Sequence, residues 1–315
     1  LAATTAGTAL VNNINDIITT TTGSNLTISG AKKLVVDGTV DELFTTINAS
    51  LSSGGVDLTM ADVAANTTFT GGTGNDRIDL HSKLTYEDNL SGGDGKDTLA
   101  IEAGTAAATA VLSNTGTTGN TFGFSGFEVL EINNALDLAS SSGDVTVDLT
   151  KEAGMNELKI TAAVTVASTD TFTVKGDSGL TLEIEGSGDI VGATGEDDFI
   201  VTVTDAETAN TSDIVNLVMD QGTSSSDITG IRINGVETLN ITEADAHASN
   251  TTTIGDIHGS VLQTINLTGA KSSAGVVAKK VIISDMASTS LSTFNASAHT
   301  GALDITGLDN NLSAL

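Results

Sequence analysis

The chain has 315 residues, enough for one large or two ordinary domains, and its 40 acidic against 12 basic side chains give a formal net charge of −28. That charge argues against binding to nucleic acid or anionic lipid, which attract basic surfaces. It suits either a protein that collects divalent cations or a solvated acidic surface that maintains solubility. The absence of Cys excludes disulfides and thiol catalysis, and no apolar stretch approaches the ~20 residues that span a membrane. Because the first residue is Leu1 rather than Met, we expect a fragment or a processed piece.

The first part of the chain predicts brief strands and one helix. Short β-prone runs lie at residues 26–28 and 34–36. The segment Thr39-Val-Asp-Glu42 then fits a helix capping box, and the apolar residues after it recur at helical spacing. This pattern predicts a short helix over residues 40–51.

The rest of the chain alternates apolar and polar residues in short runs, such as 145–149, 164–166 and 180–184, each followed by Gly, Ser, Asp or Asn. This pattern predicts many brief strands joined by tight turns. Alternation alone fits an antiparallel sandwich as well as a parallel solenoid. A hydrophobic fraction of 39 % with only 3 % aromatic residues favours a folded, aliphatic core of small stacked rungs.

Two nine-residue segments, 71–79 and 92–100, fit the pattern G-G-x-G-x-D-x-U-x, the calcium-binding turn of parallel β-rolls. Their glycines allow a very tight turn that aims peptide carbonyls inward, and an Asp adds a carboxylate. Such an all-oxygen site suits Ca²⁺, which takes about 6 to 8 oxygen ligands. The segments start 21 residues apart, which is not a multiple of nine. We therefore expect an all-β fold, mostly a parallel β-solenoid or β-roll with irregular rungs and one short N-terminal helix, and isolated sites rather than a long regular roll.

A faint internal duplication divides the chain. The first nonapeptide is followed by Asp97-Thr-Leu and by 126–132, Gly-Phe-Glu-Val-Leu-Glu-Ile. The same order recurs as a degraded nonapeptide at 192–200, Asp213-Ile-Val, and 235–241, Gly-Val-Glu-Thr-Leu-Asn-Ile. A repeat that cannot bury its own face must stack on its neighbours. We therefore predict an N-terminal mixed segment at 1–59, a first calcium-binding β unit at 60–186, and a second, related β unit at 187–315.

These motifs, with the segment 291–301, resemble RTX-type surface-layer proteins of Gram-negative bacteria over roughly residues 60–307. The closest are the calcium-dependent lattice proteins of the Caulobacter and Campylobacter type. The resemblance implies a structural component of a bacterial surface layer that self-assembles into a two-dimensional extracellular lattice in a Ca²⁺-dependent way. It also implies type I secretion, lattice neighbours as partners, and attachment through another region to the outer-membrane surface, including lipopolysaccharide. No nucleic acid and no small-molecule substrate are expected as partners. The alternative is a calcium-stabilised segment of a large secreted RTX adhesin.

In that family, the Asp of one turn and the carbonyls of another rung share an ion. Carried over to this chain, the ligands would be the carboxylates of Asp76 and Asp97, with carbonyls near Gly72, Gly74, Gly93 and Gly95 and with Asn75, Asp79 and Asp94 as further oxygen donors. The degraded copy adds Glu196, Asp197, Asp198 and Asp213. Because Ala193 replaces the second Gly there, a solvated acidic loop is the alternative for these four residues.

Signatures of catalysis are missing. The segment 176–179, Gly-Asp-Ser-Gly, matches the nucleophile segment of chymotrypsin-like proteases, but it lies between two β runs as a turn would. None of the four His residues lies in a His-Glu-x-x-His zinc motif. We therefore predict that the chain is not an enzyme. A secreted hydrolase whose catalytic domain lies outside this segment is the remaining alternative.

Overall fold

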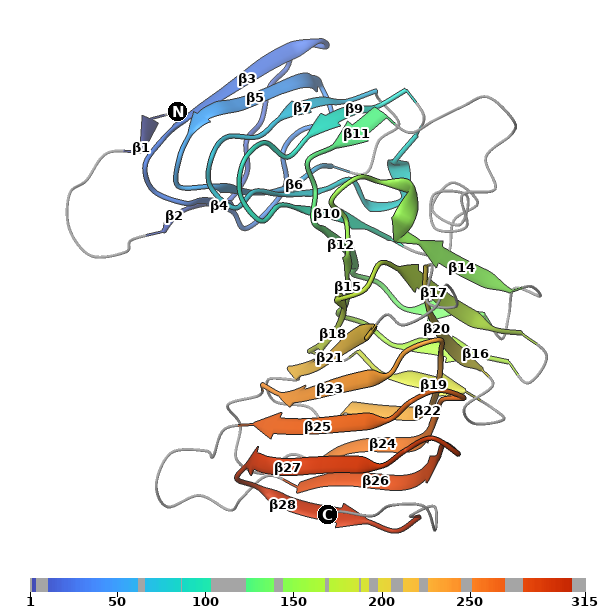
Figure 1. The fold of residues 1–315 in the computed structure, drawn as a ribbon. Helices are drawn as coiled ribbons and strands as arrows, with labels where there is room; N and C mark the ends of the chain where they lie inside the picture. Colours follow the sequence, from blue (N-terminus) through green and yellow to red (C-terminus); the bar gives the residue numbers. More distant parts are fainter. Residues whose placement is uncertain are drawn as a thin grey trace. The chain divides into compact units, whose positions relative to one another are not determined.

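The computed structural model describes residues 2–3, 11–61, 66–85, 87–102, 123–138, 144–167, 170–186, 188–192, 198–204, 212–220, 226–244, 251–269 and 280–307 (Figure 1). It divides into two compact units, Leu1–Asn133 with Lys151–Met155, and Asn134–Thr150 with Asn156–Leu315. Two 3-10 turns, η1 (His81–Lys83) and η2 (Leu149–Lys151), are the helical elements within the described residues. No helix in that part of the chain is long and apolar enough to cross a membrane.

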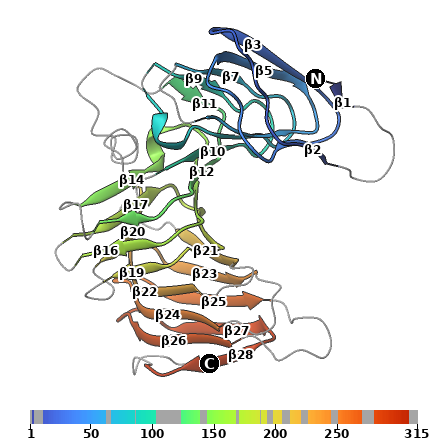
Figure 2. The same ribbon diagram turned by 180° about the vertical axis from the view of Figure 1, so that it is seen from behind.

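Unit 1 is a parallel solenoid in which successive strands alternate between two rows (Figures 1 and 2). One row holds β1 (Ala2–Ala3), β3 (Ser24–Gly30), β5 (Phe44–Ser52), β7 (Thr68–Thr70), β9 (Asn89–Ser91) and β11 (Gly123–Ser125). The other row holds β2 (Asn12–Ile14), β4 (Leu34–Val36), β6 (Val56–Thr59), β8 (Arg77–Asp79), β10 (Thr98–Ile101) and β12 (Val129–Ile132). Each rung thus adds one strand to each row.

In-register apolar side chains form the core of unit 1. Leu58, Ile78, Leu99 and Leu130 are consecutive partners on β6, β8, β10 and β12, and each is almost completely buried. Parallel strands that are covered on the inner face need this stacking of like aliphatic residues, because a one-residue slip would turn every side chain outward. The apolar residue after each nonapeptide Asp therefore fixes the register of its rung.

Unit 2 is also a parallel solenoid. One sheet holds β15 (Glu157–Ile160), β18 (Leu180–Glu185), β21 (Ile214–Asp220), β23 (Thr238–Glu243), β25 (Thr264–Gly269) and β27 (Thr293–His299) in that order. The facing strands are β13 (Leu136–Asp137), β14 (Val145–Asp148), β16 (Val164–Val166), β17 (Phe172–Gly176), β19 (Ile190–Gly192), β20 (Phe199–Val203), β22 (Ser226–Asn234), β24 (Thr251–His258), β26 (Lys280–Ala287) and β28 (Ala302–Ile305).

The rungs of unit 2 change shape along the unit. Early rungs carry two short strands opposite the first sheet, in the rows β13-β16-β19 and β14-β17-β20. The nine-residue strand β22 pairs with both rows, through Ile190↔Ile228 and Ile200↔Arg232. The eight-residue strands β24 and β26 and the four-residue strand β28 then continue from it as a single row. The predicted all-β, mostly parallel solenoid with irregular rungs is confirmed. The predicted segment boundaries at 59/60 and 186/187 concern a repeat in the sequence and stay a prediction.

The predicted helix over residues 40–51 is wrong, because residues 44–52 form β5 between β3 and β7. The register with β3 shifts between Ser24 and Asn25, so the buried residues Phe44 and Ile47 are three positions apart, as they would be on a helix. Leu51, the last residue of the apparent helical stripe, is 73 % exposed. Asp41 forms a local turn in which its Oδ1 accepts the amide hydrogen of Leu43 at 2.9 Å. The apparent helix cap is therefore a turn that precedes a strand.

Candidate metal centre at the glycine-rich turns

The two nonapeptide turns occupy adjacent rungs of unit 1. Residues 71–76 connect β7 to β8, and residues 92–97 connect β9 to β10. The turns are tied together by backbone hydrogen bonds from Gly71 to Ser91 O at 2.7 Å and from Asp94 to Gly72 O at 3.0 Å. The 21-residue separation of the two motifs is therefore the length of one rung, which has two strands and two turns.

Glycine is required where these turns stack. A Cβ on Gly71 would overlap the carbonyl oxygen of Gly92, and a Cβ on Gly92 would overlap the carbonyl oxygen of Gly126 and lie 2.7 Å from the Cβ of Asp97. Real Cβ atoms do not approach backbone atoms so closely, and a carbonyl oxygen cannot move aside without distorting the backbone of its rung. The glycine framework thus lets the backbones of successive rungs approach closely and brings the acidic side chains against them.

The acidic side chains of these turns form a ladder of hydrogen bonds between rungs. Asp76 Oδ1 accepts the amide hydrogen of Val56 at 2.7 Å, and Asp97 Oδ1 accepts that of Asp76 at 2.7 Å. Glu128 Oε2 accepts the amide hydrogen of Asp97 at 2.8 Å. Each carboxylate thus pairs with a backbone amide of the preceding rung. Such charge-assisted bonds are stronger than those between neutral groups.

Asp76 and Asp97 differ in their remaining oxygen. Asp76 Oδ2 accepts the amide hydrogen of Gly72 at 2.6 Å. Asp97 is fully buried, and its Oδ2 has no hydrogen-bond partner among the described residues. A buried carboxylate oxygen without a partner is costly, so it is a position where a bound cation would be stabilising.

The electrostatics agree with this geometry. The pKa of Asp97 is raised to about 6, chiefly by burial; the neighbouring carboxylates of Asp76, Glu128 and Asp94 also raise it, and the hydrogen bond from the Asp76 amide lowers it. Burial also raises the pKa of Asp76, partly offset by the amides of Gly72 and Val56. Acidic groups held together in this way disfavour their own ionisation until a cation compensates them.

The other predicted ligands of the two turns have different surroundings. Asn75 and Asp94 are exposed, and Asn75 Oδ1 accepts the amide hydrogen of Lys96 at 3.1 Å. A Cβ on Gly95 would lie 2.7 Å from the carbonyl oxygen of Gly74, so these two glycines also stack too closely for a side chain, although less closely than Gly71 and Gly92. The carbonyl oxygen of Gly72 accepts the Asp94 amide, and Gly93 has a φ of +106°, which favours glycine.

Asp79 belongs to an ion-pair cluster on β8 and β12. Its Oδ2 accepts hydrogen bonds from Arg77 Nη2 at 3.2 Å and from Asn133 Nδ2, and its Oδ1 accepts the His81 amide at 2.8 Å. Arg77 also binds Glu131 through two hydrogen bonds, at 2.7 and 3.0 Å. The Arg77 guanidinium thus already compensates the charge of Asp79, so we leave Asp79 out of the candidate site.

The second predicted group is only partly described, because Glu196 and Asp197 lie outside the described residues. Asp198 is buried, and a Cβ on Gly192 would overlap its Oδ2, which is the same Gly–Asp packing as in the two complete turns. Asp213 is buried before β21, and its amide donates to Glu237 Oε2 at 2.8 Å. Asp198 thus has the packing of a nonapeptide Asp. Asp213 instead donates its amide hydrogen to a Glu of the next rung, as Asp97 donates to Glu128 in unit 1.

Sequence reasoning missed the role of Glu128 and Glu237. Each accepts the amide hydrogen of an Asp in the preceding rung, Asp97 or Asp213, at 2.8 Å. The signal was present in the sequence, since both Glu residues occupy the same place in the repeated Gly-x-Glu-x-Leu pattern. The spacing within that pattern could not reveal a contact with a residue 31 or 24 positions earlier.

Within the described ranges, no group of three or more His, Asp and Glu side chains comes together to hold a metal ion. A metal at the turns would therefore be bound by one or two carboxylates and by backbone carbonyls, which is a donor set that Ca²⁺ accepts. The unpaired oxygen of Asp97 and the closely stacked glycine carbonyls fit such an ion.

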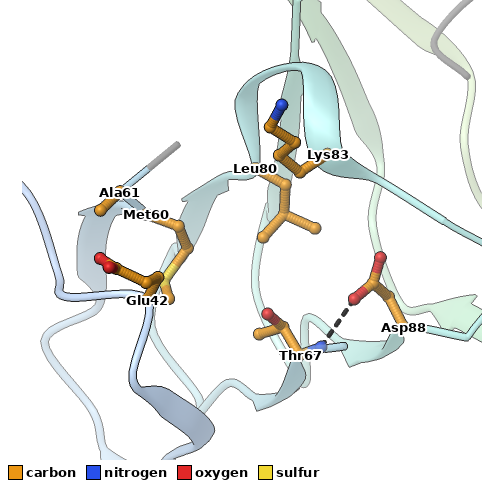
Figure 3. A pocket seen from close by; sticks show the side chains of 7 residues that line it. All are labelled: Glu42, Met60, Ala61, Thr67, Leu80, Lys83 and Asp88. Atoms are coloured by element: carbon orange, nitrogen blue, oxygen red, sulfur yellow. Dashed lines mark hydrogen bonds between the residues drawn. The ribbon is translucent and has the colours of Figure 1, made fainter. Parts of the chain in front are cut away.

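A small cavity lies at another corner of unit 1 (Figure 3). It is lined by Glu42, Met60, Ala61, Thr67, Leu80, Lys83 and Asp88. Asp88 is buried and accepts the amide hydrogens of Thr67 and Thr85, each at 2.7 Å. The cavity volume of about 10 Å³ holds one water molecule at most. This corner is therefore a structural turn rather than a binding site for an organic molecule.

Comparison with known proteins adds no relative: no family model, no curated protein and no solved structure matches the chain.

Proposed function

We propose that the chain is a structural, non-enzymatic part of an extracellular bacterial surface layer, in which Ca²⁺ bound at the glycine-rich turns stabilises the solenoid. One observation supports this proposal most directly. Asp97 is fully buried with an unpaired oxygen, in a chain whose net charge is −28. A protein that gained nothing from a cation would do better with a neutral residue there.

In this proposal Asp97 binds the ion through Oδ2 while its Oδ1 keeps the bond to the Asp76 amide. The carboxylate of Asp76 and carbonyls of the stacked turns complete the donor set. The ion supplies positive charge that compensates the acidic ladder, and the glycine backbones become fixed in the conformation that the rungs need. At a free Ca²⁺ concentration ten times Kd, each ion bound only by the folded state adds about 1.4 kcal/mol of stability.

The biological consequence follows from where Ca²⁺ is plentiful. A chain that needs about 10⁻⁴ to 10⁻³ M Ca²⁺, as extracellular modules do, stays loose in the cytosol and folds after export. We propose type I secretion, lattice neighbours as partners, and attachment to the outer-membrane surface and its lipopolysaccharide through another region. Contacts between copies that do not close on themselves extend into a sheet.

The experiment compares the purified chain in EDTA, in Mg²⁺ and in Ca²⁺ by thermal unfolding and circular dichroism, followed by electron microscopy. We expect Ca²⁺ to raise the melting temperature and Mg²⁺ to have little effect, because Mg²⁺ requires six ligands at shorter distances. Ordered sheets in Ca²⁺ would support the lattice function. Identical melting curves in EDTA and Ca²⁺ would refute calcium binding. Calcium-stabilised particles that stay monodisperse and bind cells would favour the adhesin.

A further inference from the structure

Three neighbouring strands of unit 2 present the same polar pattern to the outside. The segments 238–242, 264–268 and 293–297 have the sequences Thr-Leu-Asn-Ile-Thr, Thr-Ile-Asn-Leu-Thr and Thr-Phe-Asn-Ala-Ser. They lie on β23, β25 and β27, whose arrows run side by side in both ribbon views (Figures 1 and 2). Their first and third residues are paired in register, so Thr stacks on Thr and Asn on Asn. We call the outward side chains of these segments the Thr/Asn array.

The array is ordered by its own hydrogen bonds. Asn240 donates to Asn216 Oδ1 at 3.0 Å, Asn266 donates to Asn240 Oδ1 at 2.9 Å, and Asn295 donates to Asn266 Oδ1 at 3.5 Å. An amide has two donor hydrogens and an oxygen with two lone pairs, so the ladder uses one donor and one acceptor of each central Asn. Hydroxyl and amide groups of fixed position and mixed polarity are therefore available at the surface.

The array carries no ionisable side chain, although the chain as a whole has a charge of −28. Acidic residues begin beside it on the same sheet, with Asp220 at the end of β21 and Glu183 and Glu185 on β18. Two copies of so acidic a chain repel each other wherever carboxylates face carboxylates. The Thr/Asn array is a part of the described surface where that repulsion is absent.

We propose that the Thr/Asn array is a contact surface between two copies of this chain. A basic partner would be drawn to the carboxylates beside the array rather than to the array itself, and an apolar partner would find little apolar surface there. A second copy presents the same groups, each both donor and acceptor, at the same spacing. This inference rests on the proposed function, because it names a face through which the lattice is built.

The size of the array indicates that a single contact is weak. With strands ~4.8 Å apart and residues ~3.4 Å apart, three strands of five residues cover roughly 200 Å². A stable interface buries about 800 Å² on each partner, so one such contact does not hold a dimer at low concentration. Repetition in an assembly makes weak contacts effective, because each new contact forms between copies that are already held close.

The test measures association of the whole chain in Ca²⁺ by light scattering and electron microscopy. The variant Thr264→Lys/Thr268→Lys places two charges in the array, and Thr251→Lys/Thr253→Lys makes the same change on β24 of the other sheet, where both residues are half-buried. Each pair of substitutions lowers the net negative charge equally. If only general repulsion matters, both variants assemble more readily than the wild type. We expect the array variant to need at least tenfold more protein to assemble, and the control variant to need no more than the wild type.

A second variant guards against loss of folding. Ser297→Lys changes an exposed residue of β27, so it leaves the core intact, and we expect it to weaken assembly without lowering the melting temperature. Equal assembly by the array variants and the control would overturn the contact while the lattice function stands. If the wild type never assembles in Ca²⁺, the lattice function itself fails, and this inference fails with it.

Discussion

The substitution Asp97→Asn should have opposite effects with and without calcium. Asparagine keeps the Oδ1 acceptor for the Asp76 amide and removes the charge that faces Asp76, Glu128 and Asp94. The pKa of Asp97 is raised from 3.8 to about 6, chiefly by burial, so ionising this carboxyl costs ~3 kcal/mol more in the folded chain than in the unfolded chain. Asparagine avoids this cost. Its buried NH₂ group lies where the unpaired Oδ2 was and lacks a hydrogen-bond partner, which offsets ~1–2 kcal/mol of the stability gained.

The sign of the pH dependence follows from the direction of this change. The folded chain holds its proton at a higher pH than the unfolded chain, so without metal the stabilisation from Asp97 is present below about pH 4 and is lost as pH rises through 6. At pH 7.5 in EDTA we therefore expect Asp97→Asn to be more stable than the wild type by ~1–2 kcal/mol. In Ca²⁺ the order should reverse, because Asn removes the charge that binds the ion.

The assay is denaturant unfolding of both proteins at pH 7.5 and pH 5, in EDTA and in saturating Ca²⁺. Lowering the pH to 5 in EDTA should raise the stability of the wild type and leave the variant nearly unchanged. A variant that is less stable than the wild type in EDTA, and that still gains the full stabilisation from Ca²⁺, would refute the reasoning. That result would mean that Asp97 is a satisfied structural residue.

Two further sets of substitutions test what holds the rungs together. Arg77→Ala removes the partner of three carboxylates, two of which have side chains at most 9 % exposed, and should lower the free energy of unfolding by ~3–5 kcal/mol in a urea titration. Lys280→Ala is its control, because that ion pair is 43 % exposed on both sides and should change stability by less than ~0.5 kcal/mol. Glu128→Ala and Glu237→Ala each leave an Asp amide without its acceptor and should cost ~1–3 kcal/mol by the same measurement, whereas Gln at either position should recover most of the loss. Equal stability of the Ala and Gln variants would show that these amides find other acceptors.

The strands and the two glycine-rich turns could be predicted from the sequence because they depend on local pattern. Alternation of apolar and polar residues is a property of a few neighbouring positions, and the glycine motif specifies its own turn. The helix over 40–51 was wrong because irregular pairing with β3 places Phe44 and Ile47 at helical spacing on a strand. A register shift is decided by the neighbouring strand, so the segment alone does not contain it.

The roles of the acidic residues were harder to predict for a related reason. Asp76 accepts the amide of a residue 20 positions earlier, and Glu128 accepts one from 31 positions earlier. Rung length varies with the loops, so the partner of a given carboxylate cannot be counted along the chain. Asp79 illustrates the consequence, since a residue three positions after Asp76 belongs to an ion-pair cluster instead of the turn.

The duplicated Gly-x-Glu pattern separates two ways of joining rungs. Glu128 and Glu237 accept the amide of the earlier Asp at 2.8 Å, and the residue after each Glu donates to the carbonyl of that same Asp at 3.0 Å, from Val129 to Asp97 and from Thr238 to Asp213. This pair of hydrogen bonds between an Asp and the next rung needs no metal, because the Glu carboxylate binds a backbone amide. At the glycine turns of unit 1, the Asp of this pair is Asp97, whose Oδ2 is in addition buried and unpaired. The contact between Asp and Glu thus recurs in both units without a metal, whereas we propose that a cation completes the contact at Asp97, which would make it the place where calcium concentration controls folding.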